Sequence, residues 1–134
     1  MPIGEQIRAL VVEDDTDYAF LLATLLRREG YAALIAQDGY DALKRISADQ
    51  PDLIVLDLNL PLLDGCDVLA EVRAHHPETP VIVVSGAPDA KSRVLAHGAT
   101  ALLTKPLNVH DFLRTVSAVM APRRTDQGVS PEQG

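Results

Sequence analysis

The chain has 134 residues, of which 47% are hydrophobic and 23% charged, as is typical of one globular domain. Its 12 basic and 19 acidic residues leave a formal net charge of −7, which argues against direct nucleic-acid binding, because that needs a cationic face. No apolar stretch approaches the roughly 20 residues of a membrane-spanning helix, and the N-terminus lacks a signal-peptide pattern, so we expect a cytoplasmic protein without membrane contact.

The N-terminal part of the chain predicts a strand followed by an amphipathic helix. Residues 9–12 (ALVV) form a short apolar run that is typical of a strand. The helix is expected to be capped by Asp15, Thr16 or Asp17 and to stop at Gly30. Its apolar residues recur at i, i+3, i+4, i+7 and i+8, so we expect a core-facing stripe of Tyr18, Leu21, Leu22, Leu25 and Leu26.

Further apolar runs alternate with helical patterns along the rest of the chain. The expected strands are 31–36, 53–56, 81–84 and 101–104, and the expected helices are 40–48, 66–75, a modest one near 90–97, and one that starts after a cap at Asn108. The last helix should bury Phe112, Leu113, Val116, Val119 and Met120. Residues 121–134 have little to bury and are expected to form a flexible tail after a domain of residues 1–120.

Strands that alternate with helices predict an α/β fold with a parallel sheet and helices on both faces. Five strands are too few for a closed eight-stranded barrel. We therefore expect a doubly wound, flavodoxin-like sheet in the order 2-1-3-4-5. In such sheets the functional crevice lies at the carboxyl ends of the strands.

Polar side chains stand at four of the predicted strand ends. They are Glu13 and Asp14 after the first strand, Asp57 and Asn59 after the third, Ser85 after the fourth and Lys105 after the fifth. If the first and third strands are neighbours, their carboxylates crowd together and raise one another's pKa values. A structural core would not assemble such a set.

A hard divalent cation resolves this crowding. Mg²⁺, with Mn²⁺ able to substitute, takes carboxylate, carbonyl and water oxygens. Asp14 and Asp57 could supply carboxylates and Asn59 its backbone carbonyl, while Glu13 would act directly or through water. An open coordination position invites a phosphoryl group, whose charge Lys105 would balance while Ser85 donates a hydrogen bond. On this interpretation Asp57 is a nucleophile, exposed at the end of its strand.

The segments VVEDD, LIVLDLNLPLLDG, VIVVSG and LLTKP, in this order, resemble the response-regulator receiver domain of two-component signalling. The resemblance covers about residues 8–120. It implies that Asp57 is the phosphoacceptor, that Glu13 and Asp14 form the acidic pair, and that Asn59 supplies its carbonyl. It further implies that Ser85 is the hydroxyl switch residue, that Lys105 is the site lysine, and that a cis peptide precedes Pro106.

The resemblance also implies partners and a mode of action. The phosphoryl donor would be a sensor histidine kinase or a histidine phosphotransfer protein. The face of the fourth helix, fifth strand and fifth helix would bind either an output partner or a second copy of the chain. The protein would not be an enzyme, because it would catalyse only its own phosphorylation and dephosphorylation.

Three features depart from the family pattern. Leu102 stands where an aromatic residue is usual, three residues before the lysine, and Leu107 stands where phenylalanine is common. The stretch 85–98 is short, so its helix is expected to be short or irregular and the most mobile part of the domain. We therefore expect a subtle switch without an aromatic rotamer flip.

Three other interpretations remain open. A haloacid-dehalogenase-like phosphohydrolase also uses an aspartate nucleophile and Mg²⁺, but it wants a second acid where Asn59 stands and a cap domain for which there is no room. A flavin-binding flavodoxin needs a phosphate loop that EDDTDY, residues 13–18, would repel. A receiver domain that serves as a scaffold or as a non-switching phosphate sink is the third.

Overall fold

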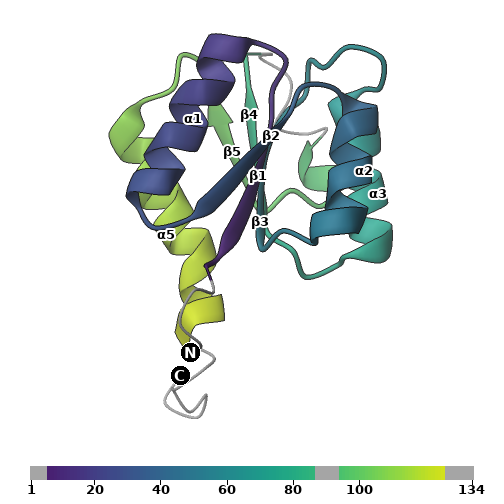
Figure 1. Cartoon of the computed structure of the whole chain (residues 1–134). Helices are drawn as coiled ribbons and strands as arrows, with labels where there is room; N and C mark the ends of the chain where they lie inside the picture. Colours follow the sequence, from purple (N-terminus) through teal and green to yellow (C-terminus); the bar gives the residue numbers. More distant parts are fainter. Residues whose placement is uncertain (1–5, 87–93, 126–134) are drawn as a thin grey trace.

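The computed structural model describes residues 6–86 and 94–125 (Figure 1). Strands and helices alternate along this part of the chain, as the sequence predicts. The strands are β1 (Arg8–Val12), β2 (Ala32–Ala36), β3 (Leu53–Asp57), β4 (Val81–Ser85) and β5 (Ala101–Thr104). The helices with assigned bounds are α1 (Thr16–Arg28), α2 (Gly39–Asp49), α3 (Gly65–His75) and α5 (Val109–Thr125).

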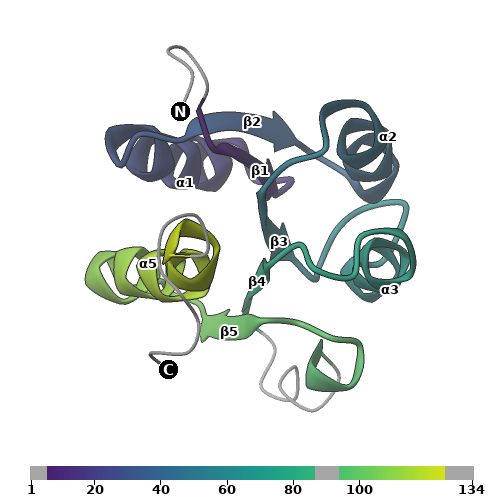
Figure 2. The ribbon, with the colours of Figure 1, turned by 90° about the horizontal axis from the view of Figure 1, so that it is seen from below.

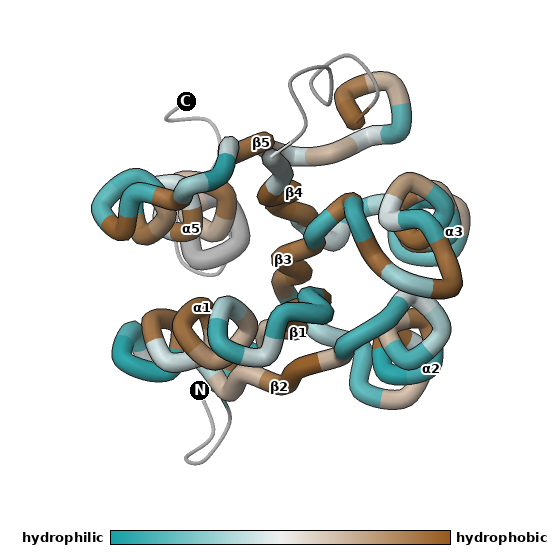
Figure 3. The backbone as a smooth tube through the Cα atoms, turned by 90° about the horizontal axis from the view of Figure 1, so that it is seen from above, coloured by the Kyte–Doolittle hydropathy of each residue, from teal (hydrophilic) through white to brown (hydrophobic). Residues whose placement is uncertain are grey.

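The strands form one parallel sheet in the order β2-β1-β3-β4-β5, which confirms the predicted doubly wound topology. Helices α1 and α5 cover one face of the sheet, and α2 and α3 cover the other (Figures 1 and 2). The central strands are the most hydrophobic part of the chain in Figure 3. All residues of β3 and β4 are buried, as expected for inner strands between two helical layers.

Alternate side chains of each strand feed two separate cores. Ala9 and Val11 of β1 pack with α1 and α5, whereas Leu10 and Val12 pack on the side of α2 and α3. Because both faces are buried, the strands read as continuous apolar runs rather than as an alternating pattern. The ends of these strands are therefore held by two cores at once.

Helix α1 begins where a capping side chain satisfies its first turn. Of the three candidate caps, Asp15 fills the role, and its Oδ1 accepts a hydrogen bond from the Tyr18 N–H at 3.0 Å. The predicted core stripe is wrong for Leu21, whose exposed fraction is 40%. Two alanines, Ala19 and Ala23, centre the buried face, and this rotates Leu21 toward solvent.

The segment between β4 and β5 is described in part. The expected helix near 90–97 lies partly outside the described residues, but residues 94–96 are helical and Gly98 follows with φ of 93°. A positive φ suits glycine at a helix end. The expected mobility of the stretch stays a prediction.

Helix α5 starts as predicted, because Asn108 Oδ1 accepts a hydrogen bond from the Asp111 N–H at 2.9 Å. Phe112, Val116 and Met120 are buried in the core. The helix continues to Thr125, past residue 120 where the tail was expected to begin. None of the helices in the described part combines the length and hydropathy that crossing a bilayer requires.

Candidate metal site at the carboxyl edge of the sheet

The sheet register brings the polar residues at the strand ends to one edge. Val12 of β1 pairs with Leu56 of β3, so Glu13 and Asp57 follow at the same level on neighbouring strands. Asp57 pairs with Val84 of β4, and Ser85 pairs with Thr104 of β5, just before Lys105. The ends of these strands therefore lie at one edge of the sheet, as the sequence predicts.

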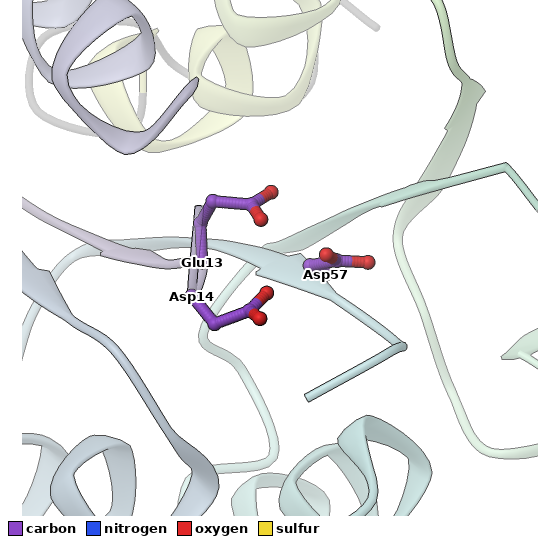
Figure 4. A group of neighbouring side chains, drawn as sticks. All are labelled: Glu13, Asp14 and Asp57. Carbon is purple, nitrogen blue, oxygen red and sulfur yellow. The ribbon is translucent and has the colours of Figure 1, made fainter. Parts of the chain in front are cut away.

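Three carboxylates form an acidic cluster here (Figure 4). Oxygen atoms of Glu13, Asp14 and Asp57 all lie within 4.8 Å of one another. Glu13 and Asp57 are buried, with exposed fractions of 2% and 4%, whereas Asp14 is exposed. The cluster thus has an open side at Asp14 and a closed side within the protein.

Asp57 is held firmly at the end of β3. Its Oδ1 accepts a hydrogen bond from the Asn59 N–H at 3.1 Å, and its Oδ2 accepts one from Lys105 Nζ at 3.2 Å. The expectation that Asp57 is exposed was wrong. Two buried cores flank the strand end, and the ammonium of Lys105 compensates the charge that burial would otherwise penalise.

Lys105 joins the two buried carboxylates. Its Nζ lies 3.0 Å from Glu13 Oε1 and 3.2 Å from Asp57 Oδ2, while 27% of its side chain remains exposed. Burial lowers the pKa of Lys105, but the pairing with Glu13 and Asp57 outweighs this effect and raises the pKa above its usual 10.5. Lys105 therefore stays an ammonium in the site.

The pKa of the Glu13 carboxyl is strongly shifted in this cluster. The pKa of Glu13 is raised from 4.5 to about 7, chiefly by burial, and the charge of Asp57 acts in the same direction. The Asp15 N–H, 3.1 Å from Oε2, and the ammonium of Lys105 lower it, but by less. Below about pH 7 the Glu13 carboxyl of the cation-free site is therefore mostly protonated, and a divalent cation could replace this proton.

For two of the predicted site residues, Asn59 and Ser85, backbone groups make contacts at the site. Asn59 is exposed, and its backbone N–H donates to Asp57. Ser85 is fully buried at the end of β4, and its carbonyl accepts a hydrogen bond from the Lys105 N–H at 3.0 Å. The roles of the Asn59 carbonyl and the Ser85 hydroxyl stay predictions. The Lys105–Pro106 peptide is cis, as the resemblance implied.

The structure adds two residues that sequence reasoning did not assign to the site. The ring of Tyr18 lies under the ammonium of Lys105, with 4.6 Å from Nζ to the ring centroid. Gly65 packs against the end of β3, where a Cβ would lie 2.6 Å from the carbonyl oxygen of Asp57. The signal in the sequence that could have identified Gly65 is a glycine at the start of a helix. Tyr18 was assigned to the apolar stripe of its helix, so no role at the site was predicted for it.

The donor set of this site fits Mg²⁺. The cluster offers carboxylate oxygens and no nitrogen or sulfur ligand among its members, which is the preference of a hard cation. A cation would also relieve the repulsion among Glu13, Asp14 and Asp57. Response regulator receiver domains generally bind Mg²⁺ at an acidic pocket of this kind.

Comparison with curated proteins gives relatives in mycobacteria. The chain is 37% identical over 127 residues to the transcriptional regulatory protein PrrA of Mycobacterium bovis, covering 93% of this chain and 54% of that protein. It is 35% identical over 124 residues to the response regulator MprA of Mycolicibacterium vanbaalenii, covering 91% and 54%. The chain thus spans about half the length of these relatives. The expected absence of nucleic-acid contact finds no support here, since PrrA is named as a transcriptional regulator.

Solved structures and a family profile agree with these relatives. A CheY-like response regulator receiver domain protein from Methanospirillum hungatei matches with a TM-score of 0.85 and 27% identity, over 91% of this chain and 99% of that one. The sequence profile of the response regulator receiver domain matches residues 9–117. The haloacid-dehalogenase alternative is not favoured. The chain therefore belongs to the receiver domain family of two-component response regulators.

Proposed function

We propose that Asp57 accepts a phosphoryl group from a phosphohistidine, with Mg²⁺ bound at Glu13, Asp14, Asp57 and the Asn59 carbonyl. The observation that carries this proposal is the pairing of Asp57 Oδ2 with Lys105 Nζ at 3.2 Å inside the acidic cluster. A carboxylate that is buried, oriented by two donors and next to open solvent at Asp14 is placed for nucleophilic attack.

In the proposed step, an Asp57 carboxylate oxygen forms a bond to phosphorus while the phosphorus–nitrogen bond of the donor breaks. The imidazole leaves with its electron pair, and an acyl phosphate remains on Asp57. Bound Mg²⁺ would neutralise charge on the transferring group. The protein mainly positions the reactants, as is general in phosphoryl transfer.

Lys105 and Ser85 would act on the phosphoryl oxygens. The Lys105 ammonium already lies 3.2 Å from Asp57 Oδ2, so a short movement would bring it to a phosphoryl oxygen. Ser85, at the end of the adjacent strand β4, would donate its hydroxyl. Both contacts would shift the segments that follow β4 and β5, and phosphorylation would in this way change the conformation of the domain.

A receiver domain is not an enzyme in the usual sense, and we propose that this one catalyses only its own phosphorylation and dephosphorylation. Its partner would be a sensor histidine kinase or a histidine phosphotransfer protein in the cytoplasm. The receiver domain would occupy residues 1–120, with α5 continuing to Thr125. The output would leave through the face that includes β5 and α5, to a partner or to a second copy of the chain.

The absence of an aromatic residue at position 102 supports a muted switch. Leu102 is partly buried and packs against the core on the side of α2 and α3. It has no hydroxyl that could form a new hydrogen bond after phosphorylation. We therefore propose that phosphorylation changes the conformation of the segment that follows Ser85, rather than the rotamer of an aromatic side chain.

Metal binding and labelling test the proposal in turn. Mg²⁺ titration followed by amide NMR should shift signals around Glu13 and Asp57 in the parent, and the Asp14→Ala variant should lose this response. Acetyl phosphate with Mg²⁺ should then add one phosphoryl group to the intact mass of the parent and none to Asp57→Asn. An Asp14→Ala variant that binds metal like the parent would move the metal site elsewhere, and labelling of Asp57→Asn would refute the phosphoacceptor.

A further inference from the structure

The ring of Tyr18 contacts the site lysine from beneath. Lys105 Nζ lies 4.6 Å from the centroid of the Tyr18 ring, within the range of a cation–π interaction. The contact joins the first turn of α1 to the segment that follows β5. The backbone of Tyr18 is anchored in this turn, because its N–H donates a hydrogen bond to the cap Asp15 at 3.0 Å.

The ammonium of Lys105 has two kinds of partner. Glu13 and Asp57 hold it by ion pairs at 3.0 and 3.2 Å, and both are proposed ligands of the cation. A divalent cation would compete for their lone pairs and would repel the ammonium. The Tyr18 ring is a partner of a different kind, because a π face does not ligate Mg²⁺ and so remains available when the cation binds.

The hydroxyl of Tyr18 contributes little to this contact. Its oxygen is buried, and no group in the described part of the chain makes a hydrogen bond with it. The aromatic face, rather than the hydroxyl, therefore makes the contact with Lys105.

We propose that Tyr18 is a positioning residue, whose ring keeps Lys105 over the site when the cation occupies the carboxylates. This inference rests on the proposed phosphoacceptor function. With the ammonium held in place, the phosphoryl group meets a positive charge at once, and no side-chain search precedes the transfer. Losing the ring should slow phosphorylation but should not weaken binding of the cation.

Ring-removing and ring-retaining variants test the proposal. With acetyl phosphate at saturating Mg²⁺, Tyr18→Leu should lower the rate of phosphorylation about threefold to tenfold, the range that a partly desolvated cation–π contact allows. Its Kd for Mg²⁺ should stay within about twofold of the parent. Tyr18→Phe retains the ring and should therefore be phosphorylated at the rate of the parent. Phe20→Leu is the matched control, because Phe20 is an aromatic residue of the same helix that is 63% exposed.

A double-mutant cycle separates positioning from a general structural effect. In a Lys105→Ala background, Tyr18→Leu should cause no further loss of rate, because the residue acts through Lys105. The NMR signals of the Lys105 ε-methylene protons should be shifted upfield by the ring in the parent and in Tyr18→Phe, with Mg²⁺ present, and the shift should vanish in Tyr18→Leu.

The outcomes are distinguishable. Equal slowing by Tyr18→Leu with and without Lys105 would overturn the positioning role, and so would an unchanged rate in Tyr18→Leu. A parent protein that acetyl phosphate does not label would refute the proposed function, and this inference with it. A labelled parent with an insensitive Tyr18→Leu would refute the inference alone.

Discussion

Replacing Glu13 with glutamine removes a carboxyl group that the fold buries to an exposed fraction of 2%. The pKa of Glu13 is raised from 4.5 to about 7, chiefly by burial. Between these two pH values the unfolded chain has lost this proton and the folded protein has kept it. Since the folded state binds more protons, its stability falls as pH rises through this window.

The size of the effect follows from the displacement of the pKa. A rise from 4.5 to about 7 corresponds to a loss of about 3 kcal/mol in the free energy of unfolding once Glu13 is ionised in both states. The Glu13→Gln variant carries no charge at this position. Without divalent cation, its free energy of unfolding should therefore lack this fall with pH.

Urea unfolding with a metal chelator, on either side of the window, measures the difference. Glu29→Gln is the matched control, because Glu29 is exposed at the end of α1, and it should retain the pH dependence of the parent. Saturating Mg²⁺ should stabilise the parent more than Glu13→Gln at high pH. An equal fall of stability with pH in the parent and in Glu13→Gln would show that ionising Glu13 does not destabilise the folded state, and would refute the reasoning.

Three further changes test other parts of the molecule. Arg73 donates hydrogen bonds at 2.7 Å to the backbone carbonyls of Gly98 and Thr79, on two different loops. Arg73→Ala should therefore lower the free energy of unfolding by about 2 kcal/mol. The control is Arg114→Ala, which should cost about 0.5 kcal/mol or less because Arg114 is exposed. Gly65→Ala would bring a Cβ to 2.6 Å from backbone atoms of Asp57 and Leu58 and should cost about 1–3 kcal/mol in urea unfolding. Gly86→Ala, with 3.9 Å of clearance, should cost clearly less. Beryllofluoride with Mg²⁺ should shift amide signals beyond the surroundings of Asp57, mainly between Ser85 and Gly98. Shifts confined to the surroundings of Asp57 would favour a phosphate sink.

The fold could be predicted from the sequence because its signals are local and agree with one another. Apolar runs bounded by turn residues gave strands to within about one residue, and parallel topology followed from their alternation with helices. The site followed in turn, since parallel strands present their carboxyl ends at one edge. The gathering of Glu13, Asp14, Asp57 and Lys105 at this edge was predicted in this way, and their roles stay predictions.

What escaped prediction depends on packing across elements. The exposure of Asp57 was misjudged because the compensating ammonium of Lys105 arrives from a distant part of the chain. Leu21 was assigned to the core because small residues such as Ala19 do not stand out in a stripe, although they define the buried face. Tyr18 matched the stripe well, and its contact with Lys105 exists only once α1 and β5 have packed.

Residue-level mapping of the phosphoryl group tests the central claim directly. Borohydride reduces an acyl phosphate to an alcohol, so a phosphorylated aspartate becomes homoserine, which tandem mass spectrometry identifies by position. After incubation with a phosphohistidine protein or acetyl phosphate, we predict homoserine at position 57 alone, with Mg²⁺ present and not with a chelator. Homoserine at position 14, or phosphate on a histidine of this chain, would contradict the assignment of Asp57.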